Sequence, residues 1–213
     1  MRWTARSAID GALGQYLATK IEQRVNYRIL GWFENGFRHI SNRLHPVHRP
    51  ADLKGMRIRV LPSEVQAKTF ELLGAVPLRW DLTEAIAAIK AGTIDAQENP
   101  FANTVTYGVH KFHHFHTVTN HFYISRPIFL HRPSFEAWPA DLQRAMREAV
   151  KRAIAFQREL AIEEDRDARA QIEAEGCEII ELTAAQHAQF RAAVAPLLDE
   201  ARETYGGKMF ELI

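Results

Sequence analysis

Apolar residues follow a helical period at the start of the chain and then shift to shorter, strand-like runs. Near the start they recur every fourth position, at Ile9, Leu13, Leu17 and Ile21. This stripe predicts a helix over residues 7–24. Further helices are predicted at 63–73, 82–90, 139–175 and 183–205, and strands at 27–33, 37–42, 56–60, 76–80, 93–96, 111–119, 122–131 and 177–182.

Polar residues at the expected helix starts support several of these boundaries. Three pairs have capping-box spacing, namely Ser63 with Gln66, Asp81 with Glu84, and Thr183 with Gln186. Asn99 precedes Pro100, which is typical of an N-cap followed by proline in the first helical turn. Residues 34–36 (ENG) give a turn signal after the first strand.

The order of the expected elements favours an α/β fold. Strands alternate with helices between residues 56 and 96, which is the pattern of a parallel sheet covered by helices. The helix over residues 139–175 has no proline after its first residue and would be about 50 Å long at about 1.5 Å per residue. That length exceeds the needs of one small domain, so we expect this helix to span two lobes.

Composition and charge exclude several function classes. The chain has 213 residues, with 27 Lys and Arg against 26 Asp and Glu, so its net charge favours neither nucleic acid nor a membrane surface as a partner. No apolar run approaches the roughly 20 residues of a membrane span. Cys177 is the only cysteine, and a small core residue is its simplest role. No apolar stretch of signal-peptide length follows the first residues.

Signatures of catalysis are missing, with one histidine run as a candidate. The sequence contains no nucleophile elbow, no P-loop and no dinucleotide-binding glycine pattern. Five of the ten histidines fall between His110 and His121. On an extended strand His114 and His116 share a face, where two imidazoles bind zinc or copper if further ligands join them. A solvated strand edge or hydrogen-bonded histidines are the alternative. We expect no metal, no cofactor and no catalytic residue.

Anion binding is the chemistry that the residues themselves favour. Arg59 lies at the end of a predicted strand, shortly before the helix that Ser63 caps. In open α/β sheets ligands sit at the carboxyl ends of strands, where a guanidinium binds a carboxylate through two hydrogen bonds. The alternative is a structural arginine paired with Glu98 or Asp95. Asn99 is a second candidate, with a purely structural N-cap as its alternative.

Four linked motifs are similar to those of one known family. They are residues 31–43 (GWFENGFRHISNR), 52–60 (DLKGMRIRV), 87–100 (AAIKAGTIDAQENP) and 138–143 (WPADLQ). In this order they resemble the solute-binding subunits of tripartite ATP-independent periplasmic (TRAP) transporters. Where the family often has an aromatic residue this chain has Leu82, with Trp80 nearby.

The resemblance implies a periplasmic-binding-protein-like fold, in which two lobes with largely parallel sheets are joined by a long helix that spans both. It implies that Arg59 is the main carboxylate clamp for a small organic acid, with Arg38 and Asn99 as further ligand contacts. Dicarboxylates, keto acids and sugar acids all fit this class. It also implies a periplasmic location, delivery of the acid to TRAP permease membrane subunits, and no catalysed reaction.

Matching to the family also predicts the domain organisation. Residues 1–35 and 125–164 correspond to part of the first lobe, and residues 36–124 and 165–213 to a complete second lobe. Family members begin with a signal peptide and a longer first lobe, so the resemblance predicts an N-terminally truncated chain. A homodimer that covers the incomplete lobe is a further hypothesis. Two rivals remain: a small metal- or anion-dependent enzyme using His110 to His121, and a truncated fragment that folds without binding.

Overall fold

The computed structural model describes residues 2–212, with side chains from Thr4 onward. Its contacts divide the chain into two compact units. The first unit comprises the described residues up to Gly36, residues 123–163 and the residues from Tyr205 onward, and the second comprises residues 37–122 and 164–204. Helix α7 (Ala140–Ala174) contributes residues to both units, and its length confirms the long helix predicted over 139–175.

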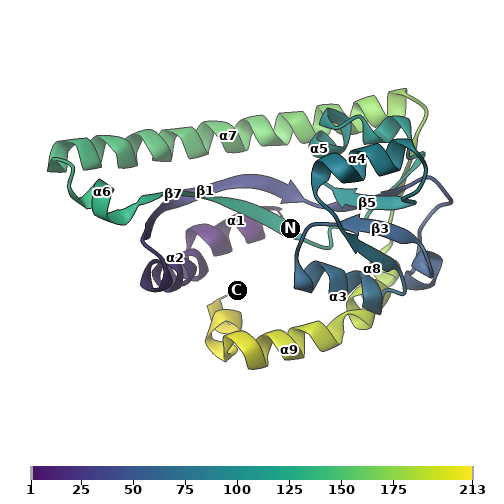
Figure 1. The fold of residues 1–213 in the computed structure, drawn as a ribbon, viewed down its shortest axis with the longest axis horizontal. Helices are drawn as coiled ribbons and strands as arrows, with labels where there is room; N and C mark the ends of the chain where they lie inside the picture. The colour runs from purple at the N-terminus through teal and green to yellow at the C-terminus, as the bar shows by residue number, and fades with distance from the viewer. Residues whose placement is uncertain (1, 213) are drawn as a thin grey trace. The chain divides into compact units, whose positions relative to one another are not determined.

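The first unit is built on a two-stranded sheet of β1 (Tyr27–Phe37) and β7 (Tyr123–His131). Its helical elements are α1 (Arg2–Asp10), α2 (Ala12–Arg24), α6 (Arg132–Glu136), the first part of α7 and the 3-10 helix η3 (Gly207–Leu212) (Figure 1). Within the described part of the chain, no helix combines the length and the apolar character that a membrane crossing requires.

Two glycines lie where the first unit departs from the predicted elements. The helix predicted over residues 7–24 is divided into α1 and α2, and a side chain on Gly14 would overlap the main-chain carbonyl of Ile9. The contact between the two helices therefore requires glycine at this position. Gly36 adopts a φ of +102°, which favours glycine, and β1 continues through the turn signal predicted at 34–36.

The second unit contains a six-stranded sheet with the strand order β4-β3-β5-β2-β6-β8. Its strands are β2 (His39–Asn42), β3 (Arg57–Val60), β4 (Val76–Arg79), β5 (Ala96–Asn99), β6 (Phe115–Val118) and β8 (Glu178–Glu181). Only β2 is antiparallel to its two neighbours, while the pairs β3–β4, β3–β5 and β6–β8 are parallel. The predicted α/β fold with a largely parallel sheet is therefore confirmed.

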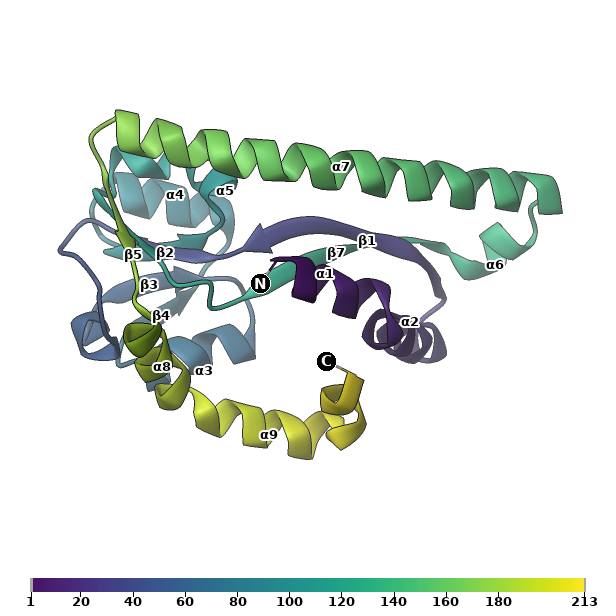
Figure 2. The same ribbon diagram turned by 180° about the vertical axis from the view of Figure 1, so that it is seen from behind.

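Helices cover both faces of this sheet (Figures 1 and 2). One face packs against α3 (Glu64–Leu72) and α8 (Ala184–Ala193), and the other against α4 (Leu82–Lys90), α5 (Phe101–Thr106) and the C-terminal part of α7. The connections include the 3-10 helices η1 (Pro50–Leu53) and η2 (Val109–Lys111), and α9 (Ala195–Tyr205) follows α8.

Two strands of the second unit begin later than the sequence predicts. The strand predicted at 93–96 is β5, three residues further on, because the amide of Thr93 still donates to the carbonyl of Ala88 at the end of α4 (3.0 Å). The strand predicted from residue 111 is β6, which begins only at Phe115, because η2 ends at Lys111 and the amides of Phe112 and His113 still donate to the carbonyl of Val109.

The last predicted helix, over residues 183–205, is two helices. It breaks at Val194, because Pro196 has no amide hydrogen for the helical ladder and its ring disfavours a continuous helix. The capping box of Thr183 with Gln186 is present with both of its hydrogen bonds, so this helix start was predicted correctly.

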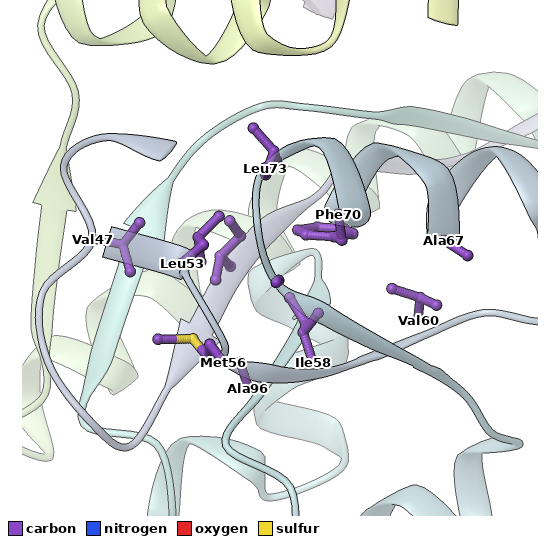
Figure 3. Packing of buried hydrophobic residues seen from close by; sticks show 11 residues of the cluster. Val47, Leu53, Met56, Ile58, Val60, Ala67, Phe70, Leu73 and Ala96 are labelled. Atoms are coloured by element: carbon purple, nitrogen blue, oxygen red, sulfur yellow. The ribbon is translucent and has the colours of Figure 1, made fainter. Parts of the chain in front are cut away.

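The main hydrophobic core of the second unit lies between its sheet and α3 (Figure 3). Its buried members are Ile40, Val47, Leu53, Met56, Ile58, Val60, Ala67, Phe70, Leu73, Ala75 and Ala96. Ile58 and Val60 point into this core from β3. Because side chains alternate along a strand, the same packing turns Arg59 toward the opposite face of the sheet.

The C-terminal residues group differently from the predicted domain division. Residues 165–213 were expected in the second lobe, but η3 contacts α2, so the residues from Tyr205 onward belong to the first unit. The correspondence of the two units with the two lobes of a binding protein stays a prediction. The homodimer also stays a prediction. The exposed aromatic residues Tyr27 (42%) and Phe129 (52%) on the first unit are compatible with it.

Phe70→Ala should destabilise the second unit strongly, because Phe70 is completely buried and its removal leaves a cavity in the main core. We expect the free energy of unfolding in urea to fall by about 3–5 kcal/mol. Val65→Ala is the matched control on the same helix, since Val65 is 46% exposed, and it should cost about 0.5 kcal/mol or less. Equal losses for the two variants would show that the core is not where the structure places it.

Candidate anion-binding site

Strands β3, β4 and β5 run parallel and end at one edge of the sheet. Arg59 lies near the end of β3, Trp80 follows β4, and Asn99 ends β5. Arg59 is the register partner of Gln97, and Asn99 is two residues further along β5. Arg59, Gln97 and Asn99 therefore lie on the same face of the sheet, close to its carboxyl edge.

Arg59 is a buried cation with unused donors. It is 3% exposed, and its Nε atom donates to the main-chain carbonyl of Trp80 at 3.0 Å. Across residues 2–212, nothing accepts a hydrogen bond from its two terminal nitrogens. Burial lowers the pKa of the Arg59 guanidinium below its ordinary value, and the charge of Glu98 counteracts part of that effect. An arginine nevertheless stays charged, so Arg59 places a positive charge without an ion-pair partner among the described residues at this edge of the sheet.

Asp95, one of the two acids that could neutralise Arg59, is paired with two other arginines. Arg57 holds it through two bonds of 2.8 Å, from Nε to Oδ2 and from Nη2 to Oδ1. Arg43 adds a bond of 3.0 Å to Oδ1. These contacts, led by the hydrogen bond from Arg57, lower the pKa of Asp95 to about 2. The alternative that Arg59 is a structural partner of Asp95 is therefore wrong.

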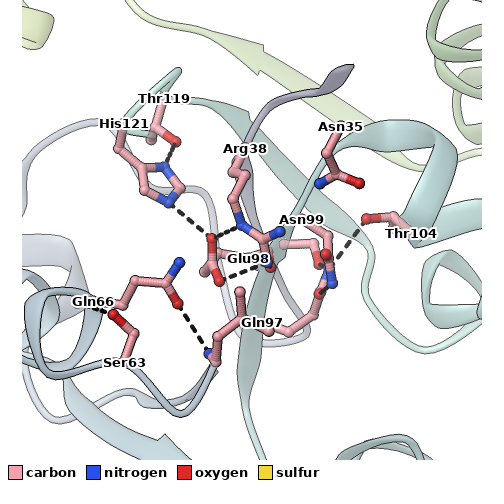
Figure 4. A network of polar contacts seen from close by, with 12 residues as sticks. Asn35, Arg38, Ser63, Gln66, Gln97, Glu98, Asn99, Thr104, Thr119 and His121 are labelled. Carbon is pink, nitrogen blue, oxygen red and sulfur yellow. Dashed lines mark hydrogen bonds and ion pairs between the residues drawn. The ribbon is translucent and has the colours of Figure 1, made fainter. Parts of the chain in front are cut away.

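Glu98, the other acid, is held by Arg38 (Figure 4). Arg38 donates from Nη2 to Oε1 at 2.8 Å and from Nε to Oε2, and the two residues are 2% and 0% exposed. His121 Nε2 lies 3.3 Å from Oε2, and the other ring nitrogen of His121 lies 2.6 Å from Thr119 Oγ1. Burial raises the pKa of Glu98, but the hydrogen bonds from His121 and Arg38 outweigh it, so the pKa lies below its ordinary value.

This pairing changes what Arg38 can offer to a ligand. Its Nη2 atom also donates to the main-chain carbonyl of Glu98. Only Nη1 has no hydrogen-bond partner among the residues that the structure describes. Arg38, and not Arg59, therefore forms the structural ion pair with Glu98. Its one remaining donor nitrogen is Nη1.

Asn99 is not the helix N-cap that the sequence pattern favours. The N-cap of α5 is Pro100, and Asn99 remains in β5, where its amide nitrogen donates to Gln97 Oε1. Gln97 Nε2 in turn donates to Ser41 Oγ at 2.8 Å. It also donates to Thr104 Oγ1 at 3.1 Å (Figure 4). The strand places Asn99 one residue too early to cap the helix, so its amide joins a buried polar network instead.

Side chains also fix the turns that follow β3 and β4. Ser63 Oγ accepts from the amide of Gln66 at 3.5 Å, while Gln66 Oε1 accepts from the amide of Leu61 at 3.1 Å, so only half of the predicted capping box forms. Asp81 caps α4 by accepting from the amide of Glu84 at 3.0 Å. Two helix N-termini thus follow strands of this edge and add partial positive charge near it.

The histidines of residues 110–121 do not converge on one point. His113 is fully buried, with Nδ1 at 3.0 Å from Ser41 Oγ, and His116 Nε2 lies 2.9 Å from the carbonyl of His113. His114 is exposed and precedes β6, so the expectation that it shares a strand face with His116 is wrong. Among the described residues, no group of three or more His, Cys, Asp or Glu side chains is arranged to hold a metal ion.

Comparison with known proteins assigns the chain to a family. The model of the bacterial extracellular solute-binding proteins, family 7 (DctP), matches residues 3–204. The chain belongs to this family. A solute-binding protein of Verminephrobacter eiseniae is 30% identical over 209 residues, which cover 98% of this chain and 62% of the relative. The C4-dicarboxylate-binding periplasmic protein DctP of Rhodobacter capsulatus is 29% identical over 200 residues, which cover 93% and 60%.

Solved structures of the family agree with the fold. A TRAP periplasmic solute-binding protein from Roseobacter denitrificans, with bound β-D-glucuronate, has a TM-score of 0.91 and 27% identity, and the match covers 96% of this chain and 68% of that one. The predicted resemblance to TRAP solute-binding proteins and the periplasmic-binding-protein-like α/β fold are thereby confirmed. The chain spans 62% and 60% of the length of the two relatives named above.

Three residues of the site went unrecognised in the sequence, namely Gln97, Ser41 and Thr104. Gln97 and Asn99 are separated by two positions, which on a strand gives them a common face. That signal was hidden because the strand was predicted at 93–96, where neither residue belongs to it. Ser41 and Thr104 come from β2 and α5, and only the register of β2 with β5 brings them to Gln97.

The buried histidines predict a pH-dependent stability. Burial lowers the pKa of His113 to about 3 and of His116 to about 4, below the usual value near 6.5. Between pH 6.5 and about 4 these histidines therefore bind protons in the unfolded chain but not in the folded chain. The free energy of unfolding falls as the pH falls through this range. His116→Gln should reduce the slope by about 1.4 kcal/mol per pH unit in urea titrations. His114→Gln, at an exposed position, should leave it unchanged, and equal slopes in both variants would contradict the burial of His116.

Proposed function

We propose that this chain binds a small organic acid through the guanidinium of Arg59 and delivers it to the membrane subunits of a TRAP permease, without catalysing a reaction. The observation that supports it most is the buried Arg59, whose two terminal nitrogens have no partner among the described residues. Membership of a solute-binding family agrees with it, since the matched proteins include a C4-dicarboxylate-binding protein and a structure with bound glucuronate.

A carboxylate is the ligand group that best satisfies Arg59. An isolated buried charge is costly, and this cost falls when an opposite charge with good hydrogen-bond geometry arrives. A carboxylate presents two oxygens in the plane of a guanidinium and accepts two parallel hydrogen bonds from it. Because Nε is already bonded to Trp80, the two terminal nitrogens are the pair that a carboxylate would take.

Arg38 and Asn99 take smaller parts in the proposed site. Arg38 shares its charge with Glu98, so it adds one hydrogen bond from Nη1 and little net attraction. Asn99 has its amide nitrogen on Gln97 and keeps Oδ1 without a described partner. The main electrostatic attraction for an acid therefore comes from Arg59.

The other parts of the function are proposed from family membership. We infer a periplasmic location and a TRAP permease as the partner, because the matched relatives are named as periplasmic binding proteins and TRAP solute-binding proteins. The enzyme hypothesis rested on a convergent histidine cluster. His113 and His116 instead bond to neighbouring protein groups, so no observation favours that hypothesis.

Arg59→Ala should weaken binding of an organic acid by well over tenfold. Removing one partner of a buried hydrogen-bonded charge pair costs about 2–5 kcal/mol, because the carboxylate keeps its desolvation cost without its partner. Arg59→Lys should also fail, since a single ammonium cannot supply two parallel bonds. Titration calorimetry with succinate and with D-glucuronate measures both effects.

Arg57→Ala is the matched control, two residues earlier on the same strand. Arg57 is 44% exposed in its side chain and bonds to Asp95, so its loss should change the affinity far less. Unchanged affinity of Arg59→Ala would refute the assignment, and a loss confined to Arg57→Ala would transfer the role to that residue. If the parent chain binds none of a panel of organic acids, the non-binding alternative holds.

A further inference from the structure

The part of α7 that belongs to the first unit, residues 140–163, packs on β1 with one of its sides (Figures 1 and 2). A side chain on Gly31 of β1 would overlap Ile154, so this glycine lets the helix approach the strand closely. Gln157 exchanges two hydrogen bonds of 2.9 Å with the main chain of Glu34. These contacts fix the rotation of α7 about its axis and turn its opposite side outward.

The outward side of this helix carries an apolar stripe instead of a polar surface. Its members follow one another at steps of three or four residues and are all exposed, namely Leu142, Ala145, Ala149, Ala153, Phe156 and Leu160. Phe156 is 68% exposed, the largest fraction among the large hydrophobic residues described. Steps of three and four keep side chains on one side of a helix, as in helices that pack along their length. We call these six residues the outer stripe.

Two charged residues beside the outer stripe indicate what covers it. Arg152 and Glu159 are exposed, and neither has an ion-pair partner among the described residues. They lie on the same flank of the stripe because seven residues make about two helical turns. That spacing is about 10 Å along the axis, which is too long for an ion pair within one helix. The two charges therefore suit a partner that presents the same two charges in reverse order.

A second copy of α7 in antiparallel orientation presents that order. When two identical helices pack around a two-fold axis beside Phe156, a residue before the axis on one helix lies level with a residue after it on the other. Arg152 of each copy then lies level with Glu159 of the other, so the ion pair forms twice. Ala153, one turn before Phe156, leaves room for the phenyl ring of the other copy. A parallel pair would instead set Arg152 against Arg152.

We propose that the outer stripe is a homodimer interface, in which the α7 helices of two copies pack antiparallel and Arg152 of each copy pairs with Glu159 of the other. The homodimer predicted from the sequence would instead cover the incomplete first lobe, where β1 and β7 form the sheet, so the two interfaces can be tested separately. One side of a single helix makes a small interface, and we expect a dissociation constant of roughly 1–100 μM.

Sedimentation equilibrium of the full chain measures this dissociation constant. Phe156→Ser should weaken the dimer by about tenfold or more, because an aromatic residue at the centre of an interface contributes most to its stability. Phe156 is exposed in the single chain, so the thermal unfolding of the variant at low concentration should stay unchanged. Phe129→Ser on β7 is the matched control, since Phe129 is 52% exposed but lies off the stripe, and it should leave the dimer unchanged.

A charge exchange tests the antiparallel pairing. Arg152→Glu sets two acids against each other at two places in the dimer and should weaken it by about tenfold. Adding Glu159→Arg restores opposite charges across the axis, so the double variant should dimerise nearly as well as the parent. Lys151→Glu makes the same change of charge one residue earlier, where a turn of about 100° takes the side chain away from the stripe, and should have little effect.

Four results would overturn the interface. The parent chain could stay monomeric at every concentration, or its dimer could survive Phe156→Ser. Dissociation by Phe129→Ser alone would assign the dimer to the sheet of β1 and β7. A double variant that dimerises as weakly as Arg152→Glu alone would exclude the antiparallel pairing of Arg152 with Glu159.

Discussion

The distribution of two buried carboxylates among the arginines determines the chemistry of the second unit. Glu98 is taken by Arg38 and Asp95 by Arg57, in both cases through two side-chain hydrogen bonds. Arg59 lies close enough to Glu98 to sense its charge, yet it forms no ion pair with a described residue. If Glu98 were unpaired, its charge would offset more of the positive charge on Arg59. Because both acids are already paired with other arginines, the proposed site keeps an unpaired cation for an anionic ligand.

Strand geometry keeps these groups in place. On β3 the residues facing α3 are apolar, and burying Ile58 and Val60 in the main core fixes the register of the strand. A slip of one residue would exchange the two faces and bury charge in that core. The same alternation on β5 turns Gln97 and Asn99 to the face that carries Arg59, while Glu98 turns away from it. Packing on one side of the sheet therefore positions the polar chemistry on the other.

The sequence predicted the parts of this arrangement that depend on local pattern. The alternation of strands and helices, the long α7 and the position of Arg59 at a strand end follow from periodicity and capping signals. The pairing of Arg38 with Glu98 joins residues 60 positions apart and depends on the contact of β2 with β5, which no local pattern reveals. The N-cap predicted at Asn99 was wrong for a similar reason, since its dipeptide with proline is typical of a cap and only the register shows it to be part of β5.

A double-variant measurement tests the partition of charges most directly. Arg38→Met leaves Glu98 without its main partner, so the charge of this carboxylate should offset more of the charge on Arg59 and weaken acid binding by about tenfold or more in titration calorimetry. Adding Glu98→Met replaces the buried pair by apolar groups of similar volume, which is often neutral for stability. The double variant should then recover most of the affinity of the parent chain. A double variant that binds as weakly as Arg38→Met alone would contradict the partition and make Arg38 a main contact of the ligand, on a par with Arg59.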